Sequence, residues 1–481
     1  MSQTKITSFF KRNNDPSQHR PQNGRSEHRP MSPGSQIALS TKLFSTTLKS
    51  LILNDNVLIS LKNQFPSRIT HLEHVNSFLR AFERSSSLPD LFSRYISKSK
   101  LPKSVIFSSF QSILDLFNRT TSYTLPFFRQ HQDDIVEFTR DQISSLVAFM
   151  LIRSISQAEI GYTTSRGIKN RVQQFHVDSI WNSSSTSSVC KLDGWISYFH
   201  VLTQTPTSFQ VPIIYERHSG ELFSVDSIKT LLGIKGSPVP SVLIHNSGSM
   251  FEDNHEDSAM IDFANKYIGG GVLRHGMVQE EIMMTEIPCL LPLCLLFEML
   301  TDTEVAVARL AFRTCKTSGY SSSTTFDCLV SPPVSRTVVA MDAVHYPFKG
   351  CPEQFTPEYL MRDLSKIITG YKAARSNPNF TINRINTGHF GCGAFNGCKE
   401  RVFVLQFIAA YLCCISFLDY YAFGEEEFSR KARCLFELVA GGVIVFDFVF
   451  DQLLAYHTFI FTKRKCSIID FIFWRWFLSC S

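Results

Sequence analysis

The chain has 481 residues, of which 44% are hydrophobic and 12% aromatic, so it can bury a large core spread over two or three domains. Its formal net charge is only +6, which is small for this length and gives no case for a nucleic-acid-binding surface. Recognition of an anion therefore has to come from a local site.

Cysteine usage and the first residues indicate the compartment. The thirteen cysteines are odd in number, irregularly spaced, and include no CxxC pair and no Cys/His quartet of zinc-ligand spacing. The polar start "MSQTKITSFFKRNNDPS" lacks an apolar stretch of signal-peptide length. We therefore expect a reduced intracellular chain, nuclear or cytoplasmic, that is not secreted.

The first forty residues (1–40) are predicted to be a disordered tail, because residues 11–40 contain no aromatic side chain and are rich in Pro, Ser, Asn, Arg and His. Within this tail, residues 3–10, "QTKITSFF", resemble the peptide that docks on the sliding clamp of DNA replication. The resemblance implies that a short turn brings Ile6, Phe9 and Phe10 together to fill an apolar pocket of the clamp. Gln3 would form a hydrogen bond nearby. The alternative is an ordinary tail with two exposed phenylalanines.

Residues 41–202 are predicted to form a helical accessory region. The segments "SLILNDNVLISLKNQF", "HLEHVNSFLRAFERS" and "DQISSLVAFMLIRSI" place apolar residues at three- and four-residue intervals. Few runs in this part alternate as a strand does.

Residues 203–433 are predicted to form an α/β domain. Short β-rich runs, "SVLIH", "AMIDFA", "EVAVARLAF", "RTVVAMDAV" and "DYYAF", are separated by loops and by helical stretches such as "TPEYLMRDLSKIITGYKAA". That alternation favours a central sheet with helices on its faces, in which ligands bind at loops beyond strand ends.

The stretch "GGGVLRHGMVQEE" falls where such a loop is expected. Three glycines, Gly269 to Gly271, let backbone amides converge on a diphosphate without interference from Cβ atoms. Glu280 and Glu281 follow, and because adjacent residues point in different directions, each carboxylate would have its own task. Crowding of the two acids would raise the pKa of at least one of them. Taken alone, the stretch is better explained by a flexible loop followed by two solvated glutamates at a helix start.

The surrounding residues change that balance. "MIDFANKYIGGGVLRHGMVQEEIMM" resembles the Asp-Phe-Ala-Asn strand, diphosphate loop and catalytic glutamates of the poly(ADP-ribose) glycohydrolase family. "RTVVAMDAVHY", "NTGHFGCGAFNG", "YYAFGE" and "DQISSLVAFML" resemble further pieces of that family, so the similarity extends, with gaps, from about residue 138 to 430. It implies a macrodomain-like mixed sheet flanked by helices, with no cofactor and no metal.

The resemblance also implies roles for individual residues. Glu281 would protonate the leaving ribose oxygen and then activate water, while Glu280 and Asn265 would hold ribose hydroxyls. Asp262 and Gln279 would support the site. The diphosphate would lie on the backbone of Gly269, Gly270, Gly271, Gly393, Ala394 and Phe395, and the adenine and outer ribose would be framed by Phe251, Glu252, Tyr320 and Phe423.

The implied activity is hydrolysis of the ribose–ribose bonds of poly(ADP-ribose), which passes through an oxocarbenium-like state that a proton-donating acid and a neighbouring carboxylate can stabilise. The expected partners are poly(ADP-ribose), proteins that carry it and the sliding clamp, with no direct DNA binding and no membrane. The alternative is a non-catalytic ADP-ribose reader recruited to the clamp, since macrodomain-like folds also serve as readers. A reader has no need of the pair Glu280 and Glu281.

Residues 434–481 depart from the family as an atypical hydrophobic segment. The run "LFELVAGGVIVFDFVFDQLLAYHTFIF" is either a true extra hairpin or sequence retained in error. Its acids, like Gln406 in the earlier run "VFVLQFIAAYLCCISFL", are costly in hydrocarbon. We expect both runs to be buried core and not membrane.

Overall fold

The computed structural model describes residues 66–81, 88–119, 126–152, 177–205, 211–234, 238–461 and 466–480. Residues 41–481 cluster as one compact unit. The expected disordered tail and clamp-binding motif lie outside the described residues.

Eight strands form one mixed sheet, in the order β1-β2-β5-β6-β4-β7-β8-β3. The first four in this order pair antiparallel, and β6, β4, β7, β8 and β3 pair parallel. The strands are β1 (Asp134–Phe138), β2 (Ile213–Ser219), β3 (Ser241–His245), β4 (Ser258–Ala264), β5 (Glu304–Ser318), β6 (Thr325–Asp342), β7 (Arg384–Gly388) and β8 (Phe417–Tyr421). The five strands expected from the sequence are confirmed, and β1, β2 and β7 are additional.

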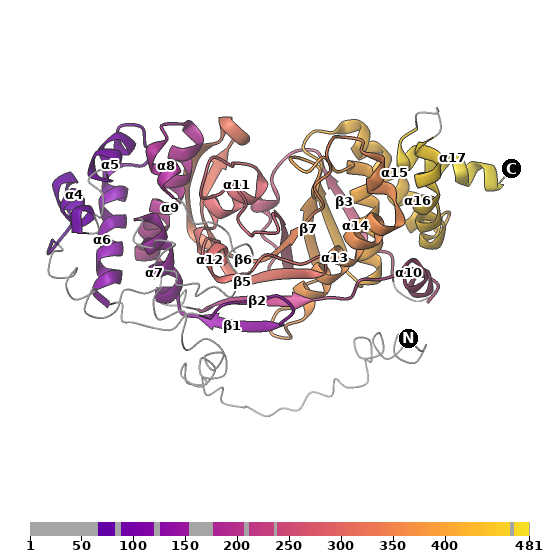
Figure 1. The fold of residues 1–481 in the computed structure, drawn as a ribbon, viewed down its shortest axis with the longest axis horizontal. Coiled ribbons are helices and arrows are strands. Elements are labelled where there is room, and N and C mark those ends of the chain that lie inside the picture. Colours follow the sequence, from indigo (N-terminus) through magenta and orange to yellow (C-terminus); the bar gives the residue numbers. More distant parts are fainter. Residues whose placement is uncertain are drawn as a thin grey trace, which may run out of the picture. The chain divides into compact units, whose positions relative to one another are not determined.

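Helices cover both faces of this sheet (Figure 1). The helices are α4 (Leu72–Ala81), α5 (Leu88–Ile96), α6 (Lys103–Arg119), α7 (Arg140–Leu151), α8 (Asp178–Asn182), α9 (Thr186–Gln204), α10 (Val225–Leu232), α11 (Gln279–Glu286), α12 (Leu293–Leu296), α13 (Pro357–Arg375), α14 (Lys399–Leu412), α15 (Glu426–Ala440), α16 (Phe446–Ile460) and α17 (Ile468–Cys480).

The alternation of side chains along β6 separates the two layers. Val338 and Ala340 belong to the core that includes α9 and α11, whereas Val339 and Met341 face Gly370 of α13. Side chains of both faces are apolar, so the central strands are buried on both sides. The expected macrodomain-like α/β fold is confirmed.

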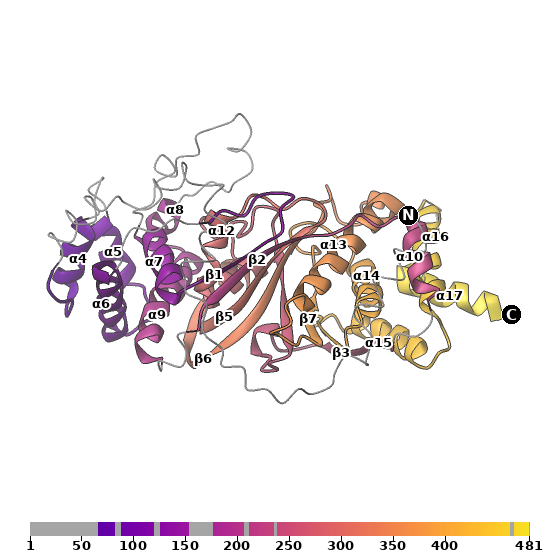
Figure 2. The same ribbon diagram turned by 90° about the horizontal axis from the view of Figure 1, so that it is seen from below.

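The region expected to be helical contributes a strand as well. β1 pairs antiparallel with β2 at the edge of the sheet, with Phe138 opposite Ile213 (Figure 2). The run "DIVEF" alternates between half-buried and exposed positions before the buried Phe138, and its five residues are too few to stand out from the helical pattern around them. The domain boundary near residue 202 stays a prediction.

The hydrophobic end of the chain packs as helices against the α/β domain. Phe446 of α16 is 6% exposed and its ring centroid lies 4.8 Å from that of Phe407 and 4.2 Å from that of Tyr411. Lys431 on α15 donates to Asp470 at the start of α17 and to Ser467 before it. The expectation of buried core is thus confirmed for α14 and for the inner face of α16. Among the described residues, no helix has the length and apolarity required to cross a membrane.

Truncation of Phe446 tests this packing. The variant Phe446→Ala should lower the free energy of unfolding by about 3 kcal/mol, because it opens a cavity between two aromatic rings. Urea denaturation would measure the change. The matched variant Phe461→Ala, at a side chain that is 65% exposed, should shift stability by less than about 0.5 kcal/mol. Equal values for the two variants would contradict the packing of α16.

Candidate functional site

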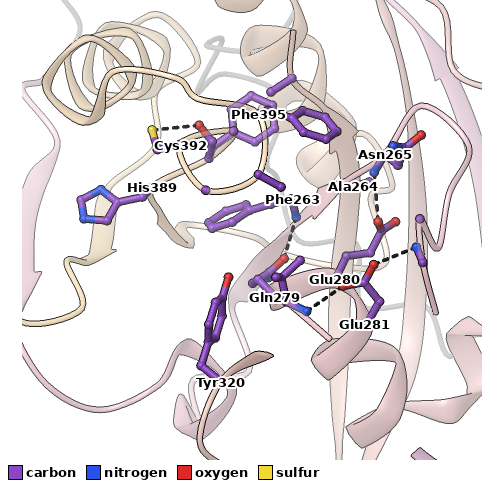
Figure 3. Close-up of a pocket in the computed structure, with 18 of the residues that line it drawn as sticks. Phe263, Ala264, Asn265, Gln279, Glu280, Glu281, Tyr320, His389, Cys392 and Phe395 are labelled. Carbon is purple, nitrogen blue, oxygen red and sulfur yellow. Dashed lines mark hydrogen bonds between the residues drawn. The ribbon is translucent and has the colours of Figure 1, made fainter. Parts of the chain in front are cut away.

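A cavity of about 900 Å³ lies beyond the ends of the parallel strands. Its walls come from the loops that follow β4, β6, β7 and β8, and from the start of α11 (Figure 3). Eleven of the residues singled out in the sequence line it: Asn265, Gly270, Gly271, Gln279, Glu280, Glu281, Tyr320, Gly393, Ala394, Phe395 and Phe423.

Glu280 and Glu281 bind two different stretches of the glycine loop. The carboxylate of Glu280 accepts from the amides of Asn265 (3.0 Å) and Gly269. The carboxylate of Glu281 accepts from the amides of Gly271 and Val278, each at 2.8 Å. The adjacent acids thus have separate partners, as the sequence predicted, and both are almost fully buried beside the cavity.

The glycines of this loop are needed for close approach of the carboxylates. A Cβ at Gly270 would lie 2.6 Å from Oε2 of Glu280, and one at Gly276 would lie 2.6 Å from Oε1 of Glu281. Gly269 and Gly270 also have φ values of 96° and 47°, which L side chains rarely adopt. Any side chain at Gly270 would push the first carboxylate out of place.

The amides of the glycine run are occupied, which corrects one expectation. Gly269 and Gly271 donate to the two glutamates, and Gly270 donates to the carbonyl of Tyr267 at 3.0 Å. In this structure these three N–H groups are therefore not free to hold a diphosphate. The run anchors the acids, a role that its composition alone could not distinguish from anion binding.

The second glycine-rich loop presents free amides instead. Among the described residues, the backbone N–H groups of Gly393, Ala394 and Phe395 have no hydrogen-bond acceptor, and all three residues line the cavity. The loop is held from behind, since the carbonyl of Phe395 accepts from Tyr346 at 2.9 Å. Successive unpaired amides beside the start of α14 can bind an anion.

Burial raises the pKa of two carboxyls beneath the cavity. Asp262, on β4, has no hydrogen-bond partner for either oxygen among the described residues, and desolvation, with the charge of Glu281, raises its pKa to about 8. Desolvation followed by the charges of Asp262 and Glu281 also raises the pKa of Glu280 well above its usual range. The cluster of three acids therefore holds at least one proton near neutral pH.

Gln279 and the aromatic residues frame the rest of the cavity. Gln279 accepts from the amide of Phe263 (2.9 Å) and donates to the carbonyl of Ile261 (3.0 Å), so it fixes α11 to the end of β4. The exposed rings of Tyr320 and Phe423 stand edge to face at 6.2 Å between centroids. They can hold a flat ring at the cavity mouth.

Four predicted site residues lie outside the cavity lining. Gly269 donates its amide to Glu280, while Asp262 is buried on β4 and its charge adds to the desolvation that raises the pKa of Glu280. Phe251 is buried, and its carbonyl accepts from Arg313. Glu252 forms an ion pair with Lys316 on β5. The residues predicted to bind the clamp, Gln3, Ile6, Phe9 and Phe10, all fall outside the described residues.

Lys191 of α9 is the main residue that the sequence did not reveal. Its ammonium donates to the carbonyls of Gly271 (3.3 Å), Val272 (2.9 Å) and Arg274 (2.8 Å), and the side chain is fully buried. Burial lowers its pKa to about 8. A single lysine in the apolar run "SVCKLDGW" was the available signal.

The cavity also includes Arg274, Lys349, His389 and Lys399.

Comparisons with known proteins match part of this chain to one family. Residues 233–430 match the family model described as poly(ADP-ribose) glycohydrolase, macro domain fold. The chain is 31% identical over 221 residues to poly(ADP-ribose) glycohydrolase 1 of Caenorhabditis elegans, covering 41% of this chain and 28% of that protein. It is 33% identical over 193 residues to poly(ADP-ribose) glycohydrolase 2 of the same organism, covering 36% and 39%. The chain thus spans well under half the length of these relatives.

Among solved structures, the chain is similar to poly(ADP-ribose) glycohydrolase from Deinococcus radiodurans in apo form. The alignment has 14% identity and a TM-score of 0.32, and it covers 47% of this chain and 93% of that one.

The buried acids predict a pH dependence of stability. Asp262 keeps its proton in the folded chain up to about pH 8 but loses it near pH 4 when unfolded, so stability should fall as the pH rises between these values. The variant Asp262→Asn removes a group that binds up to one more proton in the folded chain than in the unfolded chain. It should therefore reduce the slope of the unfolding free energy against pH by up to about 1.4 kcal/mol per pH unit. Urea denaturation at pH 5 to 8 would measure it, with the exposed Asp327→Asn as control. An unchanged slope in Asp262→Asn would contradict the raised pKa.

Proposed function

We propose that this chain hydrolyses the ribose–ribose glycosidic bonds of poly(ADP-ribose) and releases ADP-ribose, because residues 233–430 match the family model of poly(ADP-ribose) glycohydrolase. The observation that carries the proposal is the placement of two fixed, buried carboxylates on one wall of the cavity and three free amides on another. This arrangement provides acids for a glycosidic bond and donors for a diphosphate within one site.

In the proposed reaction, Glu281 donates a proton to the oxygen that leaves with the rest of the polymer. The C–O bond breaks with its electron pair on that oxygen, and an oxocarbenium-like ribose forms. Water then adds to the anomeric carbon and returns a proton to Glu281. Glu280 and Asn265 hold ribose hydroxyls and fix the sugar against the acid.

The remaining contacts follow the shape of ADP-ribose. Its diphosphate lies on the amides of Gly393, Ala394 and Phe395, and its adenine lies at the mouth between Tyr320 and Phe423. The glycine run, Gly269 to Gly271, acts through the carboxylates that it holds. Phe251 and Glu252 sit behind the adenine end and support it without lining the cavity.

Substitution of Glu281 separates an enzyme from a reader. Glu281→Gln should slow release of ADP-ribose from automodified polymerase by about 10²- to 10⁴-fold, since loss of a general acid removes that much rate. Binding of ADP-ribose, measured by calorimetry, should persist. The exposed Glu358→Gln on α13 serves as the matched control. Equal rates for wild type and Glu281→Gln would remove Glu281 from catalysis, and binding without turnover by the wild type would favour the reader.

We further propose that the tail binds the replication sliding clamp through Gln3, Ile6, Phe9 and Phe10, which would place at least part of the protein in the nucleus. The support is the spacing of these residues in "QTKITSFF".

Removal of residues 1–10 tests the tail. The shortened chain should lose capture by the immobilised clamp while its hydrolysis rate stays unchanged, because the apolar plug is separate from the cavity residues. Phe9→Ala with Phe10→Ala should act as the deletion does, whereas Thr7→Ala with Ser8→Ala should leave capture intact. Loss of hydrolysis on deletion would count against the assigned role of the tail.

A further inference from the structure

We propose that a cationic surface on the accessory helices binds the part of the polymer beyond the scissile bond, which departs after Glu281 protonates the leaving oxygen. This surface, named here the basic face, consists of Arg94, Lys98, Lys100 and Lys103. The inference rests on the proposed function and adds to it a second contact area for the same substrate.

The basic face is an uninterrupted positive stretch of sequence. Residues 91–114 contain these four cations and no acidic residue. All four side chains are exposed, and none forms an ion pair with an acidic group in the part of the chain that the structure describes. Four neighbouring exposed cations outside any ion pair produce a local positive potential that the net charge of +6 conceals.

The start of α6 strengthens this potential. Helices favour acids in the first turn, but α6 begins with Lys103 and has no acid there. The positive end of the helix dipole and a lysine therefore lie together, which costs stability unless an anion neutralises them. A helix start without an acid and with a lysine can attract an anion.

Packing contacts and hydrogen bonds join the basic face to α8 and α9. Trp181 of α8 packs against Tyr95 of α5, with ring centroids 5.8 Å apart, and the ammonium of Lys98 donates to the carbonyl of Ser184 at 3.3 Å. The amide of Lys100 donates to Asp193 of α9 at 3.0 Å. The turn between α5 and α6 is thus fixed on α8 and the first half of α9 (Figure 1).

The same two helices hold the glycine loop that precedes α11 and donates to Glu281. Lys191 of α9 donates to three carbonyls of that loop, and Ser179 of α8 donates to the carbonyl of Leu273 at 3.2 Å. Arg274, next to Leu273, lines the cavity and is exposed, so a positive side chain stands at the rim on this side. Two of the accessory helices, α8 and α9, therefore contact the loop whose residues Gly271 and Arg274 line the cavity.

The chemistry of the polymer fits this placement. Each further ADP-ribose unit carries a diphosphate, and the units beyond the scissile bond must leave the cavity past Glu281. Lysine binds a phosphate as a single positive charge, and arginine can donate two parallel hydrogen bonds to it. Added salt weakens the binding of both to phosphates. The basic face would hold these units during attack and so favour long chains over single units.

Paired substrates test the proposal. The fourfold variant Arg94→Gln, Lys98→Gln, Lys100→Gln, Lys103→Gln should lose about tenfold in kcat/KM on automodified polymerase at low salt, chiefly through KM. The difference from wild type should shrink as salt is added. ADP-ribose carrying a fluorogenic phenol on its distal ribose, which has no further units, should be cleaved at the wild-type rate.

Two comparisons keep the result specific. Lys98→Gln with Lys103→Gln should weaken polymer cleavage, whereas Lys229→Gln with Arg430→Gln, which removes the same charge from α10 and α15, should not. Lys98→Arg with Lys103→Arg should retain activity because the charge remains.

The outcomes separate this proposal from the function on which it rests. Failure of the wild type to cleave either substrate would refute the proposed function itself. Equal losses on both substrates, or unchanged polymer cleavage, would overturn the role of the basic face alone. Unchanged polymer cleavage together with lost binding of a DNA duplex would assign the basic face to nucleic acid, and so would also overturn it.

Discussion

The site depends on hydrogen bonds from the backbone of one loop to two adjacent carboxylates. Four amides, from Asn265 to Val278, hold Glu280 and Glu281 in separate orientations, and the absence of a side chain at Gly270 makes the approach possible. Because adjacent residues on a helix diverge, two acids can serve one cavity only if each has its own set of donors. The sheet fixes the start of this loop, and Lys191 fixes its middle.

Much of the fold was predictable because apolar periodicity marks buried strands and helices. The runs at β3, β4, β5, β6 and β8 were recognised in this way. β2 was missed because "IIYERHS" carries Glu216 and Arg217, which are buried in pairs with Arg309 and Glu304 and so interrupt the apolar pattern. β7, "RINTG", is five residues long and polar, and only its neighbours β4 and β8 define it as a strand.

The composition of the site was predictable, but its division of labour was not. The sequence indicated two glycine-rich loops and assigned a diphosphate to both. Only tertiary contacts distinguish them, since the amides of Gly269 and Gly271 are consumed by glutamates ten and eleven residues away in the chain. Lys191 escaped notice for a related reason, because a buried ammonium that binds carbonyls leaves no motif. Phe251 and Glu252 were predicted to frame the adenine and the outer ribose, but neither side chain lines the cavity.

The strand β1 ties the accessory helices to the sheet by backbone hydrogen bonds with β2. A chain that began at the predicted boundary near residue 203 would lack β1 and leave one edge of β2 without a hydrogen-bonding partner. An exposed edge strand of this kind can pair with strands of other molecules and lead to aggregation. Trimming would also discard the helix that bears Lys191. A fragment that carries the glutamates alone would therefore lack both the neighbour of β2 and the ammonium that fixes the glycine loop.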